Sequence, residues 1–124
     1  MNFNRKDGEA MDGIVDVKEE LKGEILILRI RGRLDAISSP QTERKVFEYI
    51  NNGQNKLVLN FDGVDYLSSA GMRMLLSTSK KIKTLEGRLV VCQVTPNVMD
   101  VLKMSGFDHV LDLSLSEEEA LRKF

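Results

Sequence analysis

The sequence predicts a single α/β domain that is built on a mainly parallel sheet with about four helices. Two short segments, Lys56–Phe61 and Arg88–Val94, are apolar on both faces, which is typical of strands that helices cover. Segments in which apolar residues recur with helical spacing alternate with these strands. This alternation favours parallel strands joined by right-handed crossovers, in the order β-β-α-β-α-β-α-β-α.

The first two strands are expected to form an antiparallel hairpin at one edge of the sheet. Val15–Leu21 begins with alternating apolar and polar residues, Lys22-Gly23 supplies a turn, and Glu24–Gly32 is the second strand. Alternation along that second strand divides its side chains between two faces. One face carries Leu26, Leu28 and Ile30, and the other carries Ile25, Ile27, Arg29 and Arg31.

Capping signals predict where several helices begin and end. Ser39-Pro40 and Thr95-Pro96 each supply an N-cap hydroxyl, followed by a proline that needs no amide partner. Gly106 is placed to end the third helix in a left-handed conformation. His109–Leu113 reads as a last short strand, and the capping box Ser116-x-x-Glu119 opens a final helix.

Composition limits the classes of function that need to be considered. The 124 residues suit one domain, which we place at residues 14–124 after a loose polar arm at residues 1–13. A formal net charge of -1 and only 6% aromatic residues favour neither nucleic acid nor an anionic membrane as a partner. No apolar run is long enough to span a membrane, and Cys92 is the only cysteine, so we expect a cytoplasmic protein.

Motifs for catalysis are absent from the sequence. It lacks the phosphate loop GxxxxGK[ST] and the dinucleotide fingerprint GxGxxG, so no cofactor is expected. A serine esterase needs G-x-S-x-G with a nearby base, but Leu67 occupies the first glycine position around Ser69, and His109 is the only histidine. One histidine and one cysteine do not make a metal site. We therefore predict that the protein is not an enzyme.

The pair Ser68-Ser69 allows two interpretations. A strand is expected to end at Phe61 and to lead through the loop Asp62–Leu67 into a helix that begins near Ala70. A serine at this point is a common N-cap. The same position lies at the carboxyl edge of a parallel strand, where a helix N-terminus tolerates an added phosphate. A helix cap alone and a phosphorylated switch both remain open from the residues.

Three segments together resemble the STAS-domain family of anti-sigma factor antagonists. They are "RGRLDA" (Arg31–Ala36), "LVLNFDGVDYLSSAGMRML" (Leu57–Leu75) and "GRLVVCQVTPNVMDVLKMSGFDHVLDL" (Gly87–Leu113). The first resembles the family's Gly-x-Leu/Ile-Asp segment, and the second its strand, loop and Asp-Ser-Ser/Ala/Thr-Gly-Leu helix start. The third resembles the family's later strand and Pro-initiated helix. Their order and spacing extend over about residues 14–124.

The resemblance implies a non-enzymatic, partner-switching regulator of transcription. The unphosphorylated protein would bind an anti-sigma factor that is also a serine kinase, and so free a sigma factor. Phosphorylation would end this binding, and a PP2C-type phosphatase would restore it. The family's phosphoacceptor aligns with Ser69, its glycine with Gly71, and the acid of its first motif with Asp35.

The resemblance also defines an expected docking face and two departures from the family pattern. Ser69 is expected to lie at its centre and the protein to be a monomer when free. Ser68 replaces the family aspartate, and Arg73 stands where glycine is frequent and could either pair with a phosphate or be solvated. The remaining residues of the expected face are Asp35, Ala36, Ser68, Ala70, Gly71 and Met72. The alternative function is an interaction or scaffold module that is not phosphorylated and could sense nucleotides.

Overall fold

The computed structural model describes residues 15–124, so the predicted arm at residues 1–13 lies outside the described residues. The strands and helices follow one another in the predicted order, with a short 3-10 helix added before the last strand. The elements are β2 (Asp16–Lys22), β3 (Ile25–Leu34), α1 (Ser38–Asn51), β4 (Lys56–Leu67), α2 (Ser69–Thr84), β5 (Arg88–Cys92), α3 (Pro96–Ser105), η1 (Phe107–His109), β6 (Leu113–Ser114) and α4 (Glu117–Leu121).

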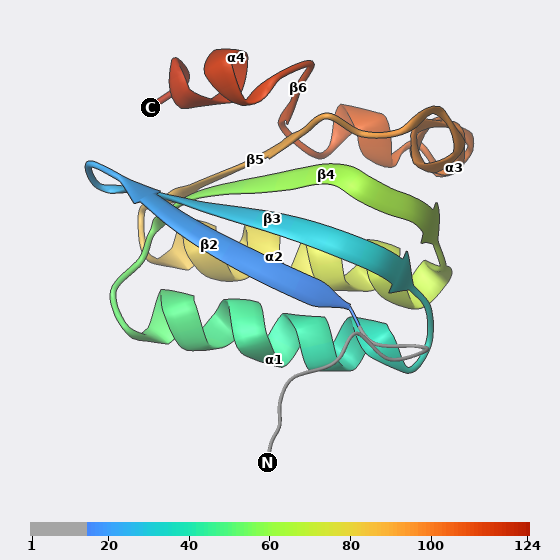
Figure 1. The fold of residues 1–124 in the computed structure, drawn as a ribbon, viewed down its shortest axis with the longest axis horizontal. Helices are drawn as coiled ribbons and strands as arrows, with labels where there is room; N and C mark the ends of the chain where they lie inside the picture. Colours follow the sequence, from blue (N-terminus) through green and yellow to red (C-terminus); the bar gives the residue numbers. More distant parts are fainter. Residues whose placement is uncertain (1–14) are drawn as a thin grey trace.

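The described strands form one mixed sheet in the order β2-β3-β4-β5-β6. β2 pairs with β3 in antiparallel register, and the three other pairs are parallel. In Figure 1, α1 and α2 run side by side below the sheet, whereas α4 lies at the top with the C-terminus. This arrangement confirms the predicted fold class, including the antiparallel hairpin at the start.

The sheet has an apolar cluster on each face. The larger cluster joins the side chains of β3, β4 and β5 to α1, α2 and α3, and it includes Leu26, Leu28 and Ile30 as the alternation predicts. The smaller cluster contains Ile27, Val58, Val90, Cys92 and Ala120, so α4 covers this second face. Both faces of the central strands are therefore buried, as their sequences indicate.

β4 is twice as long as predicted, and this changes the surroundings of the two serines. The prediction of a loop at Asp62–Leu67 is wrong, because β4 continues as far as Leu67, which pairs with Leu34 of β3. Register shifts in this pairing let Val64 and Leu67 be buried while Asp65 and Tyr66 between them face solvent. The exposed acidic residues Asp62 and Asp65 are typical of loops, although here the backbone remains in the sheet.

α1 begins two residues earlier than predicted and uses a different cap. The helix starts at Ser38, so Ser39 is not its N-cap and Pro40 is its third residue. The cap is provided instead by the Asp35 carboxylate, which accepts hydrogen bonds from the amides of Ile37 (3.0 Å) and Ser38 (2.8 Å). Pro40 is still tolerated because the amides of the first helical turn have no partner within the helix.

The predicted C-terminal end of α3 and the predicted start of α4 agree with the structure. The Thr95 hydroxyl does not cap α3, because it donates to the Val64 carbonyl (2.7 Å), and the predicted last strand also differs. Gly106 ends α3 with a φ of 79°, and the Ser116 hydroxyl accepts a hydrogen bond from the Glu119 amide (3.1 Å). Residues 109–113 do not form a strand, because η1 includes His109 and β6 contains only Leu113 and Ser114. Val110 lies in a turn and Leu111 in a bend, and only Leu113 of this stretch pairs with β5.

Candidate functional site

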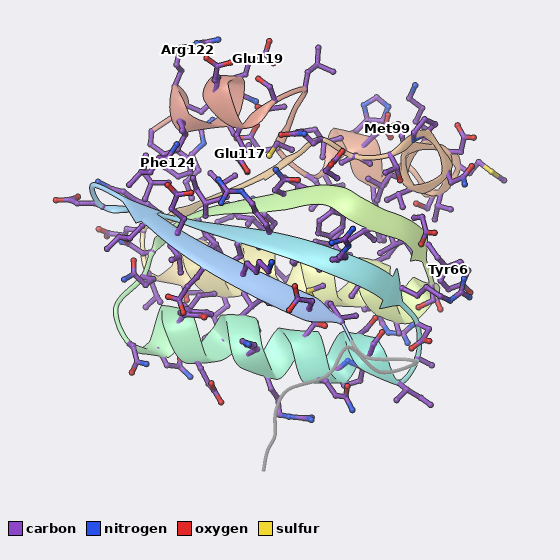
Figure 2. The ribbon with its side chains drawn as sticks, in the orientation of Figure 1. Tyr66, Met99, Glu117, Glu119, Arg122 and Phe124 are labelled. Atoms are coloured by element: carbon purple, nitrogen blue, oxygen red, sulfur yellow. The ribbon has the colours of Figure 1, made fainter. Side chains whose placement is uncertain are left out.

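Ser69 is the first residue of α2 and lies directly beyond the carboxyl end of β4. The residue is exposed, and its hydroxyl makes no hydrogen bond with any residue between 15 and 124. Figure 2 shows Tyr66, three residues earlier, projecting outward from the same end of the sheet. The structure therefore presents the Ser69 hydroxyl to solvent on a backbone that the sheet holds in place.

Ser68 has a different environment, because its hydroxyl is used in two hydrogen bonds. The residue is the N-cap of α2 with extended backbone, and its Oγ accepts from the Gly71 amide (3.2 Å). The same Oγ donates to the Leu34 carbonyl (2.9 Å), which also accepts from the Ser68 amide (2.9 Å). Ser68 thereby joins the start of α2 to the end of β3. An ionised aspartate could cap Gly71 equally well but could not donate to Leu34.

Asp35 and Ala36 lie between β3 and α1, next to this junction. Hydrogen bonds from the Ser38 amide, and then from the Ile37 amide, lower the pKa of the Asp35 carboxyl. The Ser38 hydroxyl in turn accepts from the Asp35 amide (3.0 Å). These bonds assign Asp35 a capping role that the sequence analysis did not predict, whereas Ala36 is exposed.

The next three predicted site residues lie in the first turn of α2 and differ in accessibility. Gly71 is buried, and a Cβ added there would lie 2.5 Å from Leu67 Cδ1 and 3.1 Å from the Leu34 carbonyl oxygen. Met72 is half-buried against the main core, and its sulfur accepts from the Ser105 hydroxyl (3.3 Å). Ala70 is also half-buried. Gly71 thus allows α2 to approach β3 closely and does not itself offer surface.

Three exposed apolar side chains on the segments that adjoin the start of α2 were missed in the sequence analysis. Ile37, Tyr66 and Met104 have exposed fractions of 72%, 39% and 88%. Ile37 follows the Asp35 cap, Tyr66 lies two residues before Ser68, and Met104 precedes the serine that contacts Met72. The guanidinium of Arg33 stacks over the Tyr66 ring at 4.1 Å. No shared sequence pattern marks these positions, because Ile37 follows a capping residue, Tyr66 precedes one, and Met104 lies in the last turn of α3.

A second polar cluster lies on the sheet face that α4 partly covers. The Arg29 guanidinium binds both carboxylate oxygens of Glu117, at 2.7 and 2.9 Å, and also pairs with Glu20 at 2.8 Å. The Asn60 amide donates to Glu117 (2.6 Å) and to Gln93 (3.1 Å). Figure 2 shows Glu117 between α4 and the sheet. This network attaches α4 to the sheet.

The two other residues weighed for chemistry are not brought to Ser69 by any contact in the described structure. Cys92 is buried, and burial raises the pKa of its thiol to about 12, so it is protonated and unreactive at neutral pH. His109 is exposed and lies 3.8 Å from Asp108, its nearest carboxylate. Among residues 15–124, no group of three or more potential metal ligands occurs, and no helix is long and apolar enough to cross a membrane.

Comparison with known sequences shows which proteins this chain resembles. BtrV from Bordetella bronchiseptica is 31% identical over 100 residues, which cover 81% of this chain and 86% of BtrV. An anti-sigma F factor antagonist of Paenibacillus polymyxa is 31% identical over 98 residues, which cover 78% of this chain and 84% of that protein. Both alignments therefore extend over most of the two proteins compared.

Comparisons with solved structures and with a family profile give results consistent with these sequence relatives. An anti-sigma factor antagonist from Mycobacterium paratuberculosis superposes with a TM-score of 0.79 at 20% identity, covering 88% of this chain and 92% of the other. Unphosphorylated SpoIIAA superposes with a TM-score of 0.73 at 24% identity, covering 87% and 95%. At these identities the structures show a common fold. The STAS domain profile matches residues 16–120, and the chain belongs to the STAS domain family.

Proposed function

We propose that this protein is an anti-sigma factor antagonist whose binding is switched off by phosphorylation of Ser69. In its unmodified form it binds an anti-sigma factor that is also a serine kinase, and a sigma factor is released. Relatives in Paenibacillus polymyxa and Bacillus subtilis are named anti-sigma factor antagonists, which supports the proposed antagonist function. SpoIIAA has been solved in a phosphorylated form, and this property of SpoIIAA supports the proposed switch by phosphorylation.

The observation that carries the choice of Ser69 is the contrast between the two serine hydroxyls. The Ser68 hydroxyl donates to Leu34 and accepts from Gly71, whereas the exposed Ser69 hydroxyl has no partner in residues 15–124. In the transfer, the Ser69 oxygen bonds to the γ-phosphorus of ATP and the bond to the bridging oxygen breaks. ADP leaves, and the hydroxyl proton passes to a base of the kinase. A PP2C-type phosphatase would restore the hydroxyl.

The surface around Ser69 explains how a phosphate could end binding. Ile37, Tyr66 and Met104 supply exposed apolar surface, and the half-buried Met72 lies in the same helical turn as Ser69. An apolar contact with the anti-sigma factor accommodates a neutral hydroxyl. A phosphate adds about 1.5 to 2 negative charges, which would lose their hydration in such a contact. We infer that Asp35 acts on this face indirectly, by fixing the loop that carries Ala36 and Ile37.

Catalysis by the protein itself finds no support at this serine. A nucleophilic serine needs a base within hydrogen-bond reach, and no described residue forms a hydrogen bond with the Ser69 hydroxyl. The kinase and the phosphatase are therefore assigned to partner proteins. The protein contributes the acceptor hydroxyl and the docking surface.

Incubation with the cognate anti-sigma factor and ATP, followed by intact mass measurement, tests the proposal. The wild type and Ser68→Ala are expected to gain one phosphate, whereas Ser69→Ala gains none. Complex formation should be lost with ATP for the wild type but retained by Ser69→Ala. Circular dichroism establishes that each variant is folded. A phosphate gained by Ser69→Ala, or none gained by folded wild type, would refute the switch. The second result would favour the alternative of an interaction module that is not phosphorylated.

A further inference from the structure

α2 carries an unusual distribution of charge for a helix of its length. It contains Arg73, Lys80, Lys81 and Lys83, and none of its residues is acidic. The partial positive charge at the start of a helix favours a negative group there. A phosphate on Ser69 would be the first negative charge on this helix and would lie in its first turn.

Arg73 is the basic residue of α2 that lies closest along the helix to Ser69. It follows Ser69 by four residues, so both side chains project from the same face of the helix, and both residues are exposed. Arg73 forms no ion pair with another residue of 15–124. It lines a hollow of about 250 Å³ between α1 and α2 together with Glu43 and Ala70, but no ion pair joins it to Glu43.

We propose that Arg73 is the intramolecular partner of a phosphate on Ser69, an inference that rests on the phosphorylation proposed above. A guanidinium presents parallel N–H donors that match phosphate oxygens, and it stays charged at any physiological pH. An acidic group that precedes its basic partner by four residues has the favourable orientation on a helix. Arg73 is thus a positioning residue for the phosphorylated state.

Two consequences follow for the modified protein. The nearby guanidinium favours the doubly charged phosphate over the singly charged one, because opposite charges stabilise the ionised form. The ion pair also adds to the favourable helix-dipole interaction, so phosphorylation should stabilise the folded domain. The switch would then act through surface charge on a domain that remains folded.

The test uses protein in which phosphoserine is incorporated at position 69 during synthesis, so that no kinase is required. Phosphorus NMR follows the phosphate titration in the wild type, in Arg73→Gln and in Lys80→Gln. The last is a matched control, since it removes the same charge from the same helix about 10 Å farther along the axis. Thermal unfolding of each protein with and without the phosphate provides a second readout.

In the wild type and in Lys80→Gln, the phosphate is expected to titrate a few tenths of a pH unit lower than in Arg73→Gln. The phosphate should raise the wild-type unfolding midpoint by about 2 °C, and this gain should shrink in Arg73→Gln. Identical titrations in the wild type and Arg73→Gln would overturn the inference. Because the phosphate is introduced synthetically, that outcome is independent of whether the kinase modifies Ser69.

Discussion

The hydrogen bonds of single side chains distinguish the two adjacent serines. Family resemblance selects Ser69 from the sequence, but the sequence does not reveal what Ser68 does. Its hydroxyl donates to a carbonyl 34 residues away, and such a partner depends on the packing of β3 against α2. The capping role of Asp35 was missed because a neighbouring sequence pattern indicated a different cap. The Ser39-Pro40 pattern is a strong local signal, yet α1 begins two residues before Pro40, at Ser38.

Replacement of Ser68 separates its acceptor and donor roles. Ser68→Ala should lower the free energy of unfolding by about 1–2 kcal/mol, since both hydrogen bonds are lost. Ser68→Asp restores the cap but not the donor to Leu34, so its stability should lie between those of the wild type and Ser68→Ala. Urea unfolding measures this order. A stability of Ser68→Ala equal to that of the wild type would show that the two bonds contribute nothing.

Among the elements, those with strong periodicity could be predicted and those decided by tertiary pairing could not. The buried faces of β3 and the stripes of α1 and α2 follow from apolar spacing. The second half of β4 does not, because Asp62, Gly63 and Asp65 are typical turn residues and only pairing with β3 holds them in a strand. The two-residue strand β6 could not be predicted either, since only its pairing with β5 defines it.

The packing of α2 against the end of β3 is sensitive to a single added carbon. Gly71→Ala places a Cβ within 2.5 Å of Leu67 Cδ1 and 3.1 Å of the Leu34 carbonyl oxygen. The buried Leu67 side chain must change position and the contact with Leu34 must widen by a few tenths of an ångström. We therefore expect a loss of about 1–3 kcal/mol in the free energy of unfolding and weaker binding of the anti-sigma factor. Ala70→Ser, a change of similar size on the adjacent half-buried residue, serves as the control for stability. Unchanged stability of Gly71→Ala would show that this contact relaxes easily.

Across the whole molecule, α4 is held on the sheet by charge as well as by apolar contact. Ala120 is buried, and Leu121 and Phe124 pack against the smaller core. Lys123 and Arg88 both bind Asp112, at 2.7 and 2.8 Å. Arg29 and Asn60 hold Glu117 from the sheet side. Because these partners lie far apart along the chain, no local motif in the sequence could indicate this attachment.

This attachment predicts how stability depends on pH. The hydrogen bonds from Arg29, and then from Asn60, keep the pKa of Glu117 below its ordinary value even though burial opposes them. The folded pKa is thus lower than the unfolded one. The contribution is therefore fully present above the usual glutamate pKa of about 4.3 and is lost as the pH falls through the lower folded value. Glu117→Gln should unfold at a lower temperature at pH 7.

The variant should also lose less stability than the wild type when the pH is lowered from about 6 to about 3. Thermal unfolding across this range checks the expectation. Glu118→Gln is the matched control, because it removes the same charge from an exposed neighbour on α4. If Glu117→Gln and Glu118→Gln showed the same pH profile, the ion pair with Arg29 would not contribute to acid stability.

The extension of β4 as far as Leu67 has a kinetic consequence for partner binding. Backbone pairing with β3 reaches the residue immediately before Ser68, so the proposed docking face would be formed before any partner arrives. No loop has to be ordered during the encounter, and association should proceed in one step at an ordinary protein–protein rate. Differences in affinity between hydroxyl and phosphate forms should then reside mainly in how long the complex lasts. Residence time is the quantity through which this protein would time the release of its partner.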